Sequence, residues 1–184
     1  SISDTRAKGT FPGLEMKKDA IGISFSYKLI KDLKVSANAR YISSGSNNFR
    51  TRSLSLDSYP FEDVYMMPNY IDINEVKDYW KVNNMEQNVW DPGFNNPWFT
   101  AYQNLDGFQK ANPYGNVKLD WNIIPDLSLM TRVGTFSETY TTTAQRAVSD
   151  VRYPLGRYNY SSSTSQETNM DFLLSYKKKL HKFS

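Results

Sequence analysis

The chain has 184 residues, a formal net charge of +3 and no cysteine. Its length suits one or two ordinary domains, and its mild charge does not by itself indicate a nucleic-acid partner. Without cysteine there is no disulfide framework and no thiolate site. The mean hydropathy of −0.62 and the lack of a long apolar run exclude a transmembrane helix. They leave open a membrane β-barrel, because the strands of such a barrel are apolar on one face only.

The first alternating segment runs from Asp19 to Tyr41. Apolar and aromatic residues occupy every second position from Ile21 to Leu29, and the alternation restarts at Leu33 after a short break. Successive side chains of a strand point to opposite faces of the sheet. The pattern therefore predicts a β-hairpin with one apolar and one polar face.

The same period returns in two later segments. It runs from Asn116 to Thr135 around a turn at 124–126, and again from Glu167 to Tyr176. A stub at 1–6 adds a further strand. We therefore expect an all-β, antiparallel fold of about five or six strands.

Strand length and connection length indicate that the apolar face meets lipid. The strands are expected to run for roughly ten or eleven residues, as bilayer-spanning strands do. Short turns alternate with long connections at 7–18, 42–113 and 140–166, which is the pattern of outer-membrane barrels. The connection at 42–113 would then be a long extracellular loop.

The placement of aromatic rings points the same way. A ring lies on the apolar face shortly before each short turn, and these rings would form a periplasmic aromatic girdle: Tyr27, Trp121 and Tyr176. One alternative is a soluble β-sandwich that turns its apolar face inward and uses an aromatic loop to bind glycans. Another is a small, self-closed outer-membrane barrel with an adhesive loop.

The long connection contains one helix signal, in "YIDINEVKDYW". Asp72 can cap the amide of Glu75, whose carboxylate can reach back, and Ile71 and Val76 can form a hydrophobic staple. We therefore expect a short helix in this loop. The loop also holds most of the aromatic rings, so it must pack on itself or on a partner.

Four segments, in this order, resemble the SusC/RagA-like family of TonB-dependent transporters of the Bacteroidetes outer membrane: "MMPNYIDINEVKDYW", "NNPWFTAYQNLDGF", "YGNVKLDWNIIPDLSLMTRVG" and "ETNMDFLLSYKKKL". The first two are similar to the family's long extracellular segment, and the third to the strand–turn–strand that follows it. Together with the opening hairpin they cover nearly the whole chain.

The resemblance implies part of an outer-membrane importer of a Gram-negative cell. Such importers take up oligosaccharides or peptides together with a SusD-like surface lipoprotein, and the TonB complex energises them through an N-terminal plug. Members of the family are plugged barrels of 22 strands, whereas this chain supplies about five or six strands and no plug. Residues 1–184 are therefore expected to be a segment of the barrel. Its partners would be the remaining barrel and plug, the lipoprotein, the TonB complex, membrane lipid and the glycan or peptide ligand.

The stretch "DPGFNNPWFTAYQN" and its flank hold the candidate site. Flat rings beside amides suit contact with hydroxyls or peptide groups. The candidate residues of this ligand- or partner-contacting loop are Trp90, Phe94, Asn95, Asn96, Trp98, Phe99 and Tyr102. The alternative is that these residues form only a loop core that anchors the rim.

Chemical catalysis finds little support in the sequence. His181 is the only histidine, and it lies among lysines. Asp72, Glu75 and Asp78 do not have the spacing of an EF-hand loop. With no cysteine and one histidine, a zinc site lacks its usual ligands. We therefore expect no enzyme activity, no cofactor, no metal and no nucleic-acid partner.

Overall fold

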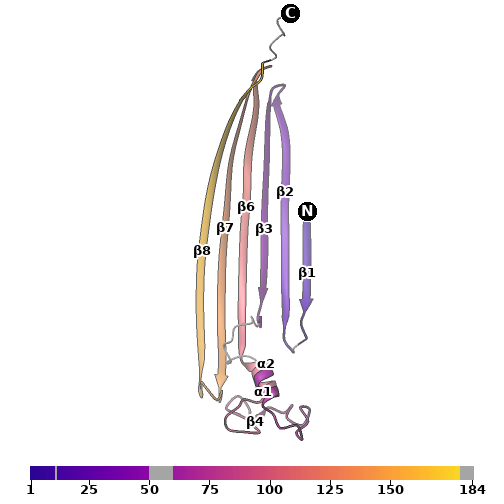
Figure 1. Ribbon diagram of the computed structural model, residues 1–184, viewed down its shortest axis with the longest axis vertical. Helices are drawn as coiled ribbons and strands as arrows, with labels where there is room; N and C mark the ends of the chain where they lie inside the picture. The colour runs from indigo at the N-terminus through magenta and orange to yellow at the C-terminus, as the bar shows by residue number, and fades with distance from the viewer. Residues whose placement is uncertain (11, 50–59, 179–184) are drawn as a thin grey trace, which may run out of the picture.

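The computed structural model describes residues 1–10, 12–49 and 60–178. Its main feature is one six-stranded sheet with the order β1-β2-β3-β6-β7-β8, in which all neighbours are antiparallel (Figure 1). The strands are β1 (Ile2–Lys8), β2 (Glu15–Ile30), β3 (Leu33–Ser46), β6 (Leu105–Ile124), β7 (Leu127–Val148) and β8 (Leu155–Tyr176). The expectation of an all-β antiparallel fold is confirmed. The sheet is not closed, and β1 and β8 are its edges.

The register assigns every second residue to one face. Phe25 pairs with Ala37, which pairs with Val117, and Val117 pairs with Val133. All of these lie on the face that the alternation marks as apolar. His181 lies outside the described residues.

The strands are much longer than expected. β6 has 20 residues, and β7 and β8 have 22 each. The expected connections at 7–18 and 140–166 are therefore wrong, because the strands leave only 9–14 and 149–154 between them. The expected long loop at 42–113 loses both of its ends, because β3 continues to Ser46 and β6 begins at Leu105. Thr and Ser residues continue the pairing of β7 with β8 where the apolar alternation stops.

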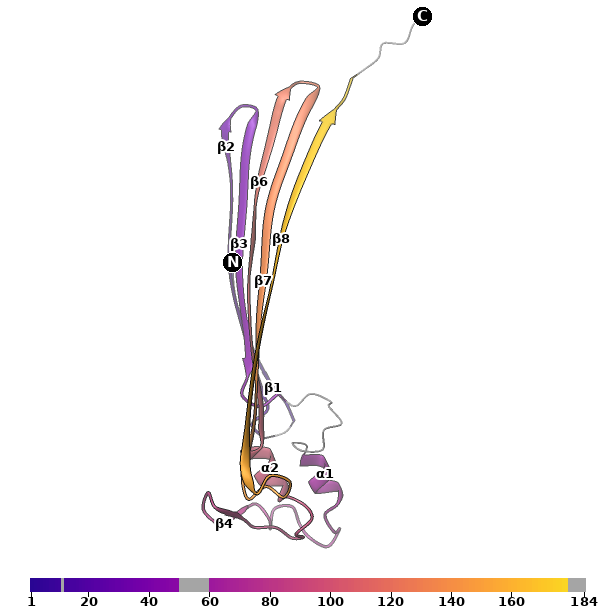
Figure 2. The same ribbon diagram turned by 90° about the vertical axis from the view of Figure 1, so that its left-hand side faces the viewer.

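Residues 60–104 form a compact cluster at the end of the sheet away from the short turns (Figures 1 and 2). It contains α1 (Pro60–Tyr65), α2 (Pro97–Gln103) and a small hairpin of β4 (Trp80–Val82) and β5 (Glu86–Gln87). Most of the largest fully buried side chains lie here, with Phe99 and Asn96 both at 0% exposure.

The helix expected within 70–80 does not form, and turns occupy its place. Asp72 does act as a local acceptor: its Oδ1 accepts from the Asn74 N–H at 2.8 Å, and its carbonyl accepts from the Glu75 N–H at 2.9 Å. The carbonyls that a helix would then use have other donors. Trp98 Nε1 donates to the Ile73 carbonyl at 2.7 Å, and Asn96 Nδ2 donates to the Val76 carbonyl at 2.8 Å.

The main sheet is a single, curved layer, which Figure 2 shows from its side. Within the described part of the chain, the other sheet has only the two short strands β4 and β5. The second full sheet that a β-sandwich requires is therefore not present among these residues. In the same ranges, neither helix is long and apolar enough to cross a membrane.

Candidate functional site

The apolar face of the main sheet is exposed over the half that carries the short turns. Ile23 is 70% exposed and Phe172 is 75% exposed. Their neighbours on this face share the property: Ile21, Phe25, Tyr27, Leu29, Val117, Trp121, Val133, Met170, Leu174 and Tyr176 are all exposed. A soluble surface rarely presents so large a continuous apolar area.

The rings at the turn end of this face follow a sloping line. Tyr27 on β2 pairs with Val35 on β3, which pairs with Leu119 on β6, so these three residues form one row across the sheet. Trp121 on β6 lies two residues closer to the turns than this row. Trp121 in turn lies in the row of Leu174 on β8, through Leu129, and Tyr176 lies two residues further on. The line therefore advances by one residue for each strand. With about 3.3 Å per residue and about 4.8 Å between strands, its slope is about 35°.

The other boundary of the apolar band has the same slope. On β8 the unbroken apolar alternation that starts at the turn end stops at Met170, which lies in the row of Phe25 on β2. On β2 the band continues four residues beyond this row, to Ile21. Four strand steps separate β2 from β8, so this boundary also moves by one residue per strand. The two edges of the band are parallel to each other.

The opposite face of the sheet carries charges and amides. Arg132 contacts Asp171 at 2.6 Å on neighbouring strands, and Lys118 contacts Asp120 at 2.8 Å. Further from the turns, Lys110 contacts Glu138 at 2.7 Å. This polar face suits water.

In the loop cluster, Asn96 caps α2 and ties it to the rest of the loop. Its Oδ1 accepts from the Trp98 N–H at 2.9 Å, and Pro97 follows at the first helical turn. Its Nδ2 donates to the carbonyls of Val76 and Asn88 at 2.8 and 2.9 Å. Because Asn96 is fully buried and uses both ends of its amide, its role here is structural.

Asp150 joins the long loop to the turn between β7 and β8. Its Oδ2 accepts from Asn95 Nδ2 at 2.9 Å and from Asn104 Nδ2 at 2.6 Å. Its Oδ1 accepts from the backbone N–H groups of Arg152 and Tyr153 at 2.9 and 2.8 Å. Asp150 is 2% exposed and was not expected from the sequence.

Asp63 joins the two helices of the cluster. Its Oδ2 accepts from the Thr100 hydroxyl at 2.6 Å, and the residue is 7% exposed. Burial, more than any other effect, raises the pKa of Asp63 from its ordinary value of 3.8 to about 7, while the Thr100 hydrogen bond opposes this. The charge of Asp63 between the two helices therefore depends on pH.

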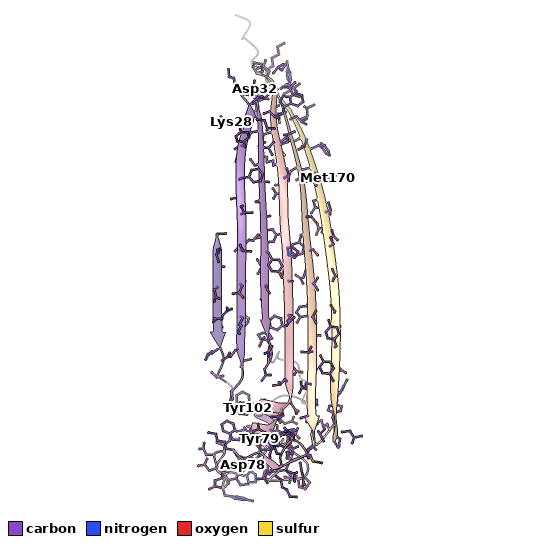
Figure 3. The ribbon with its side chains drawn as sticks, turned by 180° about the vertical axis from the view of Figure 1, so that it is seen from behind. Lys28, Asp32, Asp78, Tyr79, Tyr102 and Met170 are labelled. Carbon is purple, nitrogen blue, oxygen red and sulfur yellow. The ribbon has the colours of Figure 1, made fainter. Side chains whose placement is uncertain are left out.

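The rings of the candidate site form two groups, and Tyr79 joins the outer rings of the first group to its buried rings Phe99 and Trp80. Trp98 and Tyr102 stack at 6.1 Å and 10°, Tyr79 stacks on Tyr102 at 6.1 Å, and the Lys77 Nζ lies 5.5 Å from the Trp98 ring (Figure 3 labels Tyr79 and Tyr102). Phe99 is buried against Trp80.

Trp90 and Phe94 stack separately, at 5.4 Å and 7°. The seven expected residues are thus not one surface. Asn95, Asn96 and Phe99 hold the loop together, and Trp98 and Tyr102 form its outer stack. Within this outer stack the Trp98, Tyr102 and Tyr79 rings cover one another's faces, and Lys77 lies over the Trp98 ring.

Comparison with known proteins gives no family to which the chain can be assigned: no protein-family model matches it, and no curated protein matches it significantly.

Proposed function

We propose that the chain is a segment of an outer-membrane β-barrel that belongs to a TonB-dependent, SusC-like importer of oligosaccharides or peptides. The observation that carries the membrane part is the exposed apolar band with two parallel, sloping edges. The resemblance of the sequence to SusC-like transporters carries the importer part. The work of the chain is gated transport and includes no bond chemistry.

The slope of the band supports a barrel rather than a flat sheet on a membrane. Strands of outer-membrane barrels tilt by about 35–45° from the barrel axis. A level membrane plane then crosses successive strands at positions that shift by about one residue per strand. The line through Tyr27, Trp121 and Tyr176 and the line from Ile21 to Met170 both have this shift.

The height of the apolar band also matches the lipid-facing band of an outer-membrane barrel. From Ile21 to Leu29 the strand rises by about 26 Å, which becomes about 22 Å along the axis of a barrel tilted by 35°. The lipid-facing band of such barrels is about 25 Å tall. The free edges β1 and β8 would pair with the remaining strands of the barrel.

In this arrangement the loop cluster lies on the outer side, at the mouth of the barrel. There the Trp98–Tyr102 stack would contact the incoming ligand or a SusD-like lipoprotein. Energy would come from the TonB complex through a plug that another part of the polypeptide supplies.

A matched pair of lysine substitutions tests the membrane face. Phe25 and Ser24 are neighbours on β2 but point to the apolar and the polar face. In the whole polypeptide that carries this chain, Phe25→Lys should destabilise the folded barrel by about 2–4 kcal/mol, because it places a charge in lipid near the middle of the band. Ser24→Lys should leave the amount of folded protein in the outer membrane nearly unchanged. Equal amounts of the two variants would contradict the proposal.

A further inference from the structure

The apolar face is hollowed along β3 and β6. On the apolar face, two adjacent hollows of about 380 and 780 Å³ share Ile23, Ala39, Gly115 and Thr135, and the larger one extends past the band to Ser137 and Gln166. Beyond the band a third hollow of about 520 Å³ follows, and Tyr41 lines both this hollow and its apolar neighbour. We refer to the three together as the β3–β6 groove.

Small residues make the floor of the groove. Ala37, Ala39 and Gly115 lie next to one another on β3 and β6. The larger side chains of Ile23 and Phe25 border them on the β2 side. At Gly115 the floor is the backbone itself, since a Cβ there would lie 2.6 Å from the Asn38 carbonyl oxygen. This part of the groove is bordered by residues of β2, β3, β6 and β7, and its floor at Ala37, Ala39 and Gly115 is apolar.

Beyond Tyr41 the lining changes from apolar to polar and charged. Two of the acids on this side of the sheet are already paired with cations of β1: Arg6 lies 3.1 Å from Asp19, and Lys8 lies 3.3 Å from Glu15. Lys17 lines the same recess, and among the residues that the structure describes it has no acid within ion-pair distance. A cation thus lies on the same face four residues beyond Ile21, with the Arg6-paired Asp19 between them.

We propose that the β3–β6 groove binds one phosphorylated lipid of the outer leaflet. An acyl chain lies over Ala37, Ala39 and Gly115, the Tyr41 ring marks the level of the interface, and the Lys17 ammonium contacts the headgroup phosphate. This inference rests on the proposed membrane function. In a bilayer the molecules that meet this face are lipids, and their chains and phosphates have the same order along the membrane normal as the two parts of the groove.

Two lipids with identical chains test the proposal on the whole polypeptide, purified from membranes in a mild detergent. One is dimyristoyl phosphatidic acid, and the other is dimyristoylglycerol, which lacks the phosphate. Lys17→Gln should weaken binding of phosphatidic acid by about tenfold, because a charge-assisted contact is lost. It should leave dimyristoylglycerol unaffected. The control is Lys18→Gln, which removes the neighbouring charge from the polar face.

Ala39→Phe should fill the apolar part of the groove and reduce binding of both lipids. Thr131→Phe, which adds the same ring to the apolar face outside the groove, should not. Native mass spectrometry of the detergent complexes counts the bound lipid. If Lys17→Gln and Lys18→Gln bind phosphatidic acid equally, or if Ala39→Phe binds as the wild type does, the inference is wrong.

The wild-type protein separates this inference from the proposed function. A protein found in the outer membrane that retains neither lipid would overturn the lipid site and leave the membrane proposal intact. A protein found only in the soluble fraction would overturn both.

Discussion

Neutralising Asp63 should stabilise the loop cluster in a pH-dependent way. The Asp63 carboxylate is buried between α1 and α2 and accepts a hydrogen bond from the Thr100 hydroxyl. Asp63→Asn keeps the size and an acceptor oxygen for that hydroxyl but removes the charge. Because burial is the main cause of the raised pKa, the variant avoids the cost of holding a carboxylate away from water.

The magnitude follows from the pKa of about 7 in the folded loop and the ordinary value of 3.8. The folded-state pKa is the higher one, so the folded loop binds the proton more tightly, and stability falls as pH rises between these two values. The full difference corresponds to about 4 kcal/mol above pH 7. Asp63→Asn should therefore gain up to about 4 kcal/mol over wild type at pH 8, and this gain should shrink by about 1.4 kcal/mol per pH unit below pH 7.

Urea titration of the detergent-solubilised protein, followed by tryptophan fluorescence, provides the measurement, since Trp80, Trp90 and Trp98 all lie in the cluster. Asp78→Asn is the control, because it removes a charge from an exposed position of the same loop (Figure 3). Its effect should be small at both pH 5 and pH 8. A gain for Asp63→Asn that is equal at both pH values would refute the argument from burial, and so would a loss of stability at pH 8.

The hairpins of the sheet could be predicted from the sequence because their signal is local. Where one face meets an apolar medium and the other meets water, every second residue must change character, as between Ile21 and Leu29. The turns near Asp32 and Pro125 follow directly from the interruptions of this pattern. The pairing of Phe25 with Ala37 is the register that the hairpin turn requires.

The far halves of β7 and β8 could not be predicted in this way. There neither face is continuously apolar, so the alternation that marks a strand disappears even though the strand continues. What holds these residues is pairing between distant parts of the chain. Thr139 meets Thr164 and Thr141 meets Ser162, each at 3.2 Å between hydroxyl oxygens. Only the β-propensity of threonine is visible in the sequence itself.

The loop cluster shows a competition between local and distant partners. Asp72 carries a genuine turn signal, but Trp98 and Asn96 take the carbonyls that would extend it into a helix. The helix α2 was not expected, although Asn96 followed by Pro97 is an N-cap with proline at the first helical position. Asp150 had no comparable signal, since Asn95 and Asn104 are far from it in the chain.

Three further predictions follow from the proposed orientation and the loop. Cysteine can be introduced in place of Asp78, in the outer loop, or of Asp126, in a short turn. On intact cells an impermeant maleimide should label the first variant and not the second. If only the Asp126 variant is labelled, the proposed topology is inverted. Expressed alone without detergent, the chain should aggregate, because its apolar band and both sheet edges are uncovered, and a sharp monomeric peak in size-exclusion chromatography would contradict this. The double variant Trp98→Ala with Tyr102→Ala should reduce ligand uptake or co-purification of the lipoprotein severalfold, because it removes the outer ring stack. The amount of folded barrel should stay nearly the same, since neither residue lies on a strand of the main sheet. If uptake and co-purification are both unchanged, the stack only stabilises the loop, and the contact with ligand or lipoprotein lies elsewhere.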